Sequence, residues 1–169
     1  MKQNKTRFSA AVITASDTGA AGARIDESGK VMQEILEAYG FRIKYYEVIP
    51  DDFEIIKQKL IYLCDMEKVD LVVTTGGTGF SERDVTPEAT KEVIKREVPG
   101  VSEAIRYYGM QKTPRSMLSR GISGIRDRTL IINLPGSPKA VRESLEGIID
   151  TVHHGLDILK GISSECARK

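Results

Sequence analysis

The sequence predicts an α/β fold in which a parallel sheet is covered by helices on both faces. Short apolar runs alternate along the chain with longer segments whose apolar residues recur every three or four positions, as in amphipathic helices. The runs are apolar almost throughout, which is typical of parallel strands buried on both faces. Strands that alternate with helices favour the same arrangement.

The first half of the chain predicts three strands and two helices. The expected strands are 8–15, 41–49 and 69–75. The first helix is expected at 26–39, because its apolar residues have helical spacing and Gly40 follows as a stop. The second helix begins at Pro50-Asp51-Asp52, and its apolar stripe ends at Cys64. The segment between the first strand and the first helix is expected to be a loop.

The second half predicts further helices and one more strand. A helix is expected at 86–97 with Pro87 in its first turn, and another helical segment follows Pro99. The run at 128–134 predicts a strand, and Pro135-Gly136-Ser137-Pro138 then opens a final helix at 138–160. The intervening segment 108–127 is interpreted as a mixture of helix and loop.

Length and charge favour one globular domain spanning 1–169. The net charge is +1, with both signs interspersed, so we expect neither a nucleic-acid-binding protein nor a membrane surface. No apolar run approaches the roughly 18 residues of a membrane span. The apolar stretch near the amino terminus is interpreted as a strand rather than a signal peptide, which predicts a cytoplasmic protein. Cys64 and Cys166 show no metal-binding spacing, and we expect a buried thiol and an unpaired one.

Ligands of open α/β sheets bind at the carboxyl ends of the strands. Four expected strand ends carry glycine, hydroxyl or acidic residues, and we expect them to line one edge of the sheet. They are Ser16-Asp17-Thr18, Pro50-Asp51-Asp52, Thr75-Gly76-Gly77-Thr78-Gly79 and Pro135-Gly136-Ser137-Pro138.

The segment Thr75-Gly76-Gly77-Thr78-Gly79 is a candidate phosphate-binding loop. Glycines let successive backbone N–H groups turn toward one anion. The loop lacks the Lys of a P-loop, and Glu82 stands where a dinucleotide-binding motif has its third glycine. A simple tight turn between a strand and a helix is the alternative interpretation.

Asp84 follows this loop closely and suggests a metal ion. A carboxylate beside a phosphate would repel it unless a cation such as Mg²⁺ lay between them. The alternative is that Asp84 or Thr86 caps the next helix. Asp51 has the same ambiguity, because Asp51-x-x-Glu54 is also a suitable start for a helix.

Some basic residues could bind an anion. The candidates are Arg83, Arg115, Arg120, Arg126 and Lys139. Arg120 lies in a loop-like stretch, which favours binding, whereas the others are expected on a solvated face. His153 and His154 are adjacent on a helix and point in different directions, so we expect them to be exposed rather than to form a ligand pair.

Two long segments, TTGGTGFSERDVTPEAT and LSRGISGIRDRTLIINLPGSPKAV, strongly resemble the MogA/MoaB family of molybdenum-cofactor biosynthesis, which includes domains of gephyrin. The resemblance runs from the Ser16-Asp17-Thr18 loop to the last helix. It implies a three-layer α/β/α fold with a mostly parallel central sheet, and a homotrimer. It also suggests the molybdate-insertion protein as a partner.

The resemblance further implies that the protein binds molybdopterin and transfers AMP from ATP to its terminal phosphate, with Mg²⁺, giving pyrophosphate. The two functional aspartates of the family match Asp51 and Asp84, which would be catalytic and hold the metal. Phosphate binding would fall to Thr75, Gly76, Gly77, Thr78 and Gly79. The residues that match the substrate groove are Asp17, Ser119, Arg120, Pro135, Gly136 and Ser137.

Two other functions remain open from the sequence. The first is a binding module that carries molybdopterin or a nucleotide without chemistry, which an assay of pyrophosphate release would distinguish. The second is a nicotinamide-dependent oxidoreductase, against which the missing third glycine argues.

Overall fold

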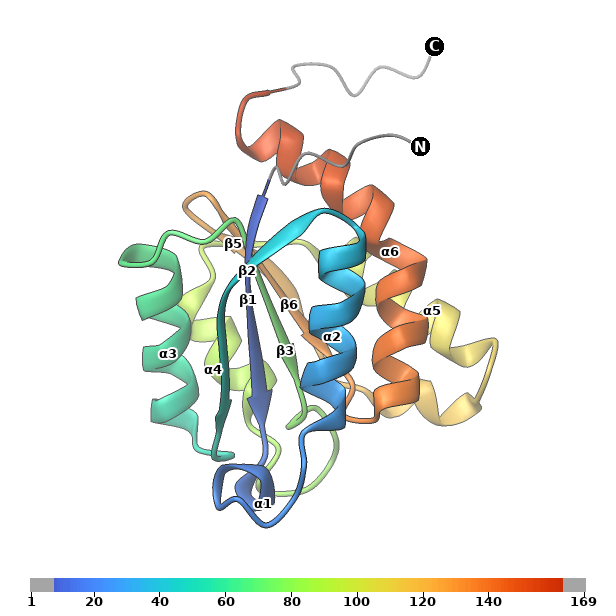
Figure 1. The fold of residues 1–169 in the computed structure, drawn as a ribbon. Coiled ribbons are helices and arrows are strands. Elements are labelled where there is room, and N and C mark those ends of the chain that lie inside the picture. The colour runs from blue at the N-terminus through green and yellow to red at the C-terminus, as the bar shows by residue number, and fades with distance from the viewer. Residues whose placement is uncertain (1–7, 163–169) are drawn as a thin grey trace.

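The computed structural model describes residues 8–162, which form a central sheet between two layers of helices (Figure 1). The strands are β1 (Phe8–Ala15), β2 (Phe41–Ile49), β3 (Leu71–Thr75), β4 (Arg96–Glu97), β5 (Ser123–Arg126) and β6 (Thr129–Leu134). The helices are α1 (Asp17–Ala20), α2 (Glu27–Ala38), α3 (Phe53–Asp65), α4 (Thr86–Val93), α5 (Pro99–Met110), the 3₁₀ helix η1 (Pro114–Leu118) and α6 (Pro138–Leu159). The predicted three-layer α/β/α fold is confirmed.

The sheet has the order β2-β1-β3-β6-β5-β4. Its first four strands are parallel, whereas β5 pairs antiparallel with β6, and β4 pairs antiparallel with β5. From β1 the chain runs to β2 at one edge and then returns to β3 on the other side of β1. The strand order therefore reverses between β1 and β3, which is where open α/β sheets form their binding crevice.

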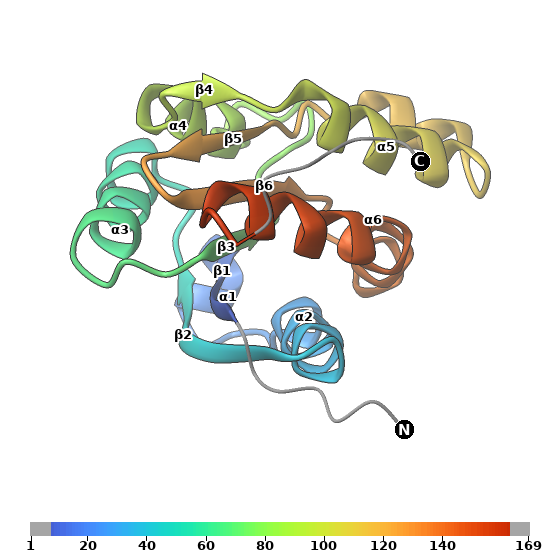
Figure 2. The same ribbon diagram turned by 90° about the horizontal axis from the view of Figure 1, so that it is seen from above.

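Helices α2, α5 and α6 cover one face of the sheet, and α3 and α4 cover the other (Figure 2). Alternate residues of each strand point to opposite faces. Val12 and Val73 therefore join the core beneath α2 and α6, while Ala11 and Val72 join the core beneath α3. This two-sided burial is the reason that β1, β3 and β6 are apolar almost continuously, whereas the edge strand β2 is only partly buried and carries charged residues.

The helix expected at 86–97 is shorter in the structure. It ends at Val93, and Ile94 takes an extended conformation that leads into β4. The partner of β4 is β5, which lies within the segment 108–127 and was not predicted as a strand. Gly124 allows this pairing, because a side chain there would lie 2.8 Å from the carbonyl oxygen of Arg96 and close to Ile94. Helix α1, which begins at Asp17, was also missed, since it is a single turn in an expected loop.

Two smaller expectations can be compared with the structure. Cys64 is a buried free thiol, as predicted, and burial raises its pKa to about 12, while Cys166 lies outside the described residues. The expectation that both histidines are exposed is wrong for His153. Its ring packs against Phe8 and Phe41, and Nε2 lies 2.7 Å from a backbone carbonyl. Among residues 8–162, no helix is long and apolar enough to span a membrane.

Asp70 directly precedes β3 and joins it to the end of α6. It therefore lies at the amino-terminal end of the strand, away from the carboxyl ends of the parallel strands. Its carboxylate pairs with Lys160, and one oxygen also accepts hydrogen bonds from the backbone N–H and hydroxyl of Ser9. Burial alone would raise the pKa of Asp70, but the bonds from Lys160 and Ser9 outweigh it and hold the pKa below its ordinary value of 3.8.

We expect Asp70→Asn to lower the free energy of unfolding at pH 7 by about 1–3 kcal/mol, the scale of hydrogen bonds to a charged group. A lowered carboxyl pKa stabilises the fold above the unfolded-state pKa, and this contribution is lost as the pH falls through the folded-state pKa. The difference from the native protein should therefore shrink below about pH 4. Denaturant titrations at several pH values measure it.

Asp127→Asn is the control for this prediction. Asp127 pairs with Lys95, and both side chains are more than half exposed, so the change should cost no more than about 0.5 kcal/mol. Equal losses for the two variants would contradict a special role for Asp70.

Candidate active site

The loops after β1, β2, β3 and β6 lie together at the lower end of the molecule in Figure 1. The hydroxyl of Thr75 donates to the carbonyl of Pro135 (2.6 Å), which joins the end of β3 to the end of β6. The hydroxyl of Ser28, in α2, donates to the carbonyl of Gly136 (2.7 Å). The strand ends singled out from the sequence therefore lie together at one edge of the sheet, as expected.

The glycine loop needs its glycines for two reasons. Gly76 and Gly77 have φ values of 89° and 65°, a left-handed conformation that other residues rarely adopt. Space is also lacking, because a Cβ atom at Gly76 would overlap the carbonyl oxygen of Ala15, and one at Gly77 would overlap the hydroxyl of Thr86. The loop is thus pressed against β1 and the start of α4.

Asp51 bonds to the turn after β1 rather than capping α3. The backbone N–H of Asp17 donates to Oδ2 of Asp51 (3.1 Å), and the backbone N–H of Asp51 donates to Oδ1 of Asp17 (3.0 Å). The cap of α3 is Asp52, which accepts from the N–H of Ile55 (3.0 Å). The suggestion that Asp51 caps the helix is therefore wrong, and its carboxylate is available for another purpose.

The charges around Asp51 are mostly negative. Burial raises its pKa above the ordinary value, and the carboxylates of Asp17 and Asp84 raise it further, while the N–H of Asp17 and the charge of Arg83 act in the opposite direction. An ionised Asp51 is therefore short of positive charge, and a bound cation would supply it.

Asp84 also has a position that capping does not explain. Its Oδ2 accepts from the backbone N–H of Ser81 (2.9 Å) and lies against Gly79. Helix α4 begins after Val85 without any side-chain cap, so neither Asp84 nor Thr86 caps it. Residues 8–162 hold no group of three His, Cys, Asp or Glu side chains arranged for a metal. A cation between Asp51 and Asp84 would therefore need further oxygen ligands, such as phosphate oxygens.

Arg83 and Asp17 join the segment after the glycine loop to the turn after β1. The guanidinium of Arg83 donates from Nε (3.0 Å) and Nη2 (2.9 Å) to the two carboxylate oxygens of Asp17. Both side chains are exposed. The bonds from Arg83 and from the N–H of Asp51 hold the pKa of Asp17 below its ordinary value. Arg83 is thus paired, although it does lie on the solvated surface, as expected.

Arg120 fastens the glycine loop to the segment before β5. Its backbone N–H donates to the carbonyl of Thr78 (2.9 Å). Its guanidinium donates from Nε to the carbonyl of Gly79 (2.7 Å), from Nη2 to the carbonyl of Asp84 (2.6 Å), and from Nη1 to the carboxylate of Glu88. In this structure Arg120 holds the loop in place, while its contact with molybdopterin stays a prediction.

We expect Arg120→Ala to lower the free energy of unfolding by about 1.5–3 kcal/mol, because it removes hydrogen bonds from a charged group to partly buried carbonyls. Turnover should fall as well, since the loop loses its support. Arg120→Lys should rescue neither property, because an ammonium group cannot reproduce the planar fork of donors. Thermal unfolding and turnover of each variant check this.

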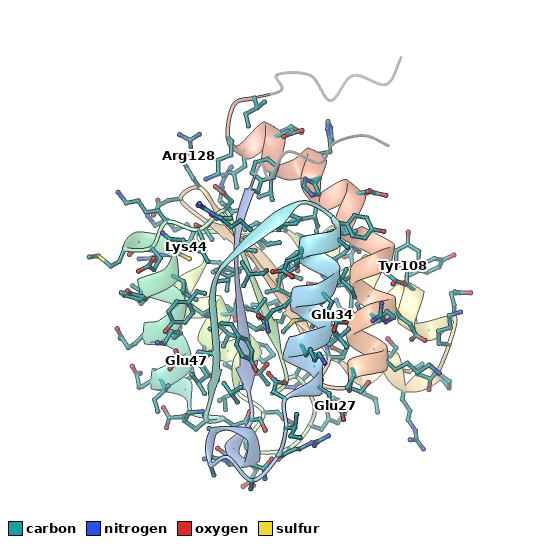
Figure 3. The ribbon with its side chains drawn as sticks, in the orientation of Figure 1. Glu27, Glu34, Lys44, Glu47, Tyr108 and Arg128 are labelled. Atoms are coloured by element: carbon teal, nitrogen blue, oxygen red, sulfur yellow. The ribbon has the colours of Figure 1, made fainter. Side chains whose placement is uncertain are left out.

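The control is Arg128→Ala. Arg128 lies far from the site: Glu27, at the start of α2, lines one of the site's cavities, and Arg128 lies at the opposite end of the molecule (Figure 3). Arg128 is exposed and bonds one carbonyl, so its removal should cost less than about 1 kcal/mol and leave turnover unchanged. An Arg120→Ala variant as stable as Arg128→Ala would contradict the fastening role.

Two cavities lie side by side at the strand ends and share Gly76 and Gly136. The first, of about 420 Å³, lies between the glycine loop and the α5–η1 segment, and Asp84, Arg115 and Ser119 line it. The second, of about 360 Å³, lies between the end of β1 and the start of α2. Its polar lining includes Ser16, Arg24, Asp26, Ser28 and Ser137.

Some predicted anion partners lie elsewhere. Arg126 forms an ion pair with Asp65 and bonds the carbonyl of Val93, so it serves the fold. Lys139 lines neither cavity. Sequence reasoning did not single out Arg24, in the loop before α2, or Asp26, the N-cap of α2. Their approach to the strand ends depends on the fold.

Comparison with known proteins shows what the chain as a whole is similar to. Residues 11–154 match the family model described as "probable molybdopterin binding domain". The chain is 43% identical to the molybdopterin adenylyltransferase of Helicobacter pylori (strain ATCC 700392 / 26695) over 152 residues, which are 89% of this chain and 86% of that protein. It is 40% identical to gephyrin of Dictyostelium discoideum over 158 residues, covering 88% of this chain and 22% of gephyrin.

Solved structures show the same likeness. The molybdopterin biosynthesis enzyme MoaB of Thermus thermophilus superposes with a TM-score of 0.87 at 46% identity, covering 92% of this chain and 98% of that one. The Mog protein of Mycobacterium ulcerans gives a TM-score of 0.85 at 42% identity, covering 90% and 99%. The chain therefore belongs to the MogA/MoaB family of molybdopterin-binding domains.

Proposed function

We propose that this protein transfers AMP from ATP to the terminal phosphate of molybdopterin, giving adenylyl-molybdopterin and pyrophosphate. The observation that carries the proposal is the pair of carboxylates, Asp51 and Asp84, neither of which caps a helix, on either side of a glycine loop. Similarity to the molybdopterin adenylyltransferase of Helicobacter pylori over most of the chain supports the same reaction.

The chemistry needs alignment and charge neutralisation more than it needs a base. The attacking phosphate is already anionic near neutral pH, so a general base is not required. The main obstacle is repulsion between two anions. Backbone N–H groups of Gly76, Gly77 and Gly79 would bind phosphate oxygens and orient them, with the hydroxyls of Thr75 and Thr78 beside them.

The residues present fit a magnesium ion. Mg²⁺ is usually bound through one or two carboxylates together with substrate phosphates, and Asp51 and Asp84 match that donor set. Both would hold the ion through their carboxylates, and the ion would neutralise charge on the phosphates. In this proposal the two aspartates are metal ligands rather than acid–base groups.

The two adjoining cavities suit a reaction with two substrates. Each substrate would occupy one cavity, and the phosphates would meet at the shared wall of Gly76 and Gly136. Ser137 in one cavity and Ser119 in the other would contact the substrates, with Pro135 beside them, and Asp17 would support Asp51.

We also propose that the protein is a cytoplasmic homotrimer that passes its product to a molybdate-insertion protein. Exposed apolar side chains support association with another protein chain, since such patches are typical of interfaces. Those on α5 and η1 are Tyr107, Tyr108, Met110, Met117 and Leu118. Light scattering at several protein concentrations tests the trimer, and a mass of one chain throughout would contradict it.

Incubation of the protein with molybdopterin, ATP and Mg²⁺ tests the proposed reaction. We expect one pyrophosphate for each adenylyl-molybdopterin, and no product when EDTA replaces Mg²⁺. Molybdopterin that binds without pyrophosphate release would instead indicate a binding module. Product formed at full rate in EDTA would support the transferase activity but contradict the requirement for Mg²⁺.

A further inference from the structure

The hydroxyl of Thr86 is buried and unsatisfied. Its oxygen has no hydrogen-bond partner among residues 8–162, and the residue has no exposed surface. A buried hydroxyl without a partner destabilises the fold, so most such groups are paired. Thr90, one turn later in α4, shows the usual arrangement, because its hydroxyl accepts from Nδ2 of Asn133 (3.0 Å). The unpaired state of Thr86 therefore calls for an explanation.

The position of this hydroxyl suggests one. The backbone N–H of Thr86 donates to the carbonyl of Gly77 (3.1 Å), which holds the start of α4 against the glycine loop. A Cβ atom at Gly77 would overlap the hydroxyl of Thr86 and would lie 3.2 Å from Oδ1 of Asp51. The hydroxyl of Thr86 and Oδ1 of Asp51 thus both lie close to the same point beside Gly77.

The carboxylate of Asp51 can accept another hydrogen bond there. The bond from the backbone N–H of Asp17 goes to Oδ2, and a carboxylate has about four acceptor positions on its two oxygens. Thr86 is neutral, so a bond from it would orient the carboxylate without competing with a cation. Partners of this kind commonly orient metal-binding side chains.

We propose that Thr86 is a positioning residue for Asp51, whose Oδ1 accepts the hydroxyl hydrogen of Thr86 when Asp51 holds a divalent cation. This inference rests on the proposed function, because it requires a cation at Asp51. The hydroxyl is then part of the site. Without a cation it stays unpaired and destabilises the fold. A purely structural role predicts instead that the hydroxyl stabilises the fold.

The test combines three variants with two measurements. The variants are Thr86→Val, which removes the hydroxyl, Thr86→Ser, which keeps it, and Thr90→Val, which removes a paired hydroxyl from the same helix. The measurements are the affinity for Mn²⁺ in the presence of α,β-methylene-ATP, by electron paramagnetic resonance, and the unfolding temperature without a cation.

We expect Thr86→Val to weaken Mn²⁺ binding about 10- to 100-fold, the usual effect of losing a partner of a metal ligand. Its unfolding temperature without a cation should not fall, because the lost hydroxyl had no partner. Thr86→Ser should bind Mn²⁺ within about threefold of the native protein. Thr90→Val should unfold at a lower temperature with unchanged Mn²⁺ affinity.

Native Mn²⁺ affinity in Thr86→Val would overturn the inference and leave the proposed reaction intact. A fall in unfolding temperature as large as that of Thr90→Val would also overturn it, because the hydroxyl would then have a structural partner. Full turnover of the native protein in EDTA would contradict both the requirement for a divalent cation and the positioning role of Thr86.

Discussion

Asp51→Asn is expected to lower kcat/KM for adenylation at least about 100-fold, the scale of losing one strong electrostatic contact in an active site. The amide keeps an oxygen that can accept from the backbone N–H of Asp17, so the local fold should persist. It lacks the negative charge that a magnesium ligand needs. Turnover with molybdopterin and ATP measures the loss.

Stability should behave differently from activity in this variant. Burial and the nearby carboxylates of Asp17 and Asp84 raise the pKa of Asp51. A raised carboxyl pKa destabilises the fold above that pKa, and the penalty disappears below the unfolded-state value. Without a cation, Asp51→Asn should therefore unfold at pH 7 at the same temperature as the native protein or higher.

Asp52→Asn is the matched control, one residue away and with the same loss of charge. Asp52 caps α3, and Asn caps helices about as well as Asp, so both stability and turnover should remain near native. An inactive Asp52→Asn, or an Asp51→Asn that turns over normally, would show that the assignment after β2 is wrong.

Asp84→Asn is expected to reduce kcat/KM by a similar factor, at least about 100-fold. The amide oxygen can still accept from the N–H of Ser81, so the glycine loop should keep its shape. What is lost is the second charge available to a cation. Molybdopterin affinity should change little, and separate binding and turnover measurements distinguish the two effects.

Glu82→Gln provides the comparison for Asp84. Glu82 is exposed, lies two residues away and lines neither cavity, so the same change in charge should leave turnover within about twofold of native. Near-native turnover in Asp84→Asn would remove the metal-holding role. The glycine loop and Asp51 would then remain as the support for a phosphate site.

Much of the fold and the site could be predicted from the sequence. Helical spacing and apolar runs depend on contacts within a few residues, so the main layers, and most helices and strands, were predictable. The glycine loop and the four strand ends were expected at one edge of the sheet, where the structure places them, because parallel strands bring their carboxyl ends together. Two long motifs identified the family.

The tertiary structure decided what depends on residues far apart in the chain. Asp51 meets the turn at Asp17, 34 residues away, and this contact left the capping of α3 to Asp52. Arg120 holds carbonyls 41 and 36 residues away, which gave it a structural role beside the expected one. Helix α4 ends at Val93 rather than at the expected residue 97, because the following residues pair as β4 with the distant β5. Local periodicity contains no information about these partners, since each arises only when the sheet brings distant strand ends together.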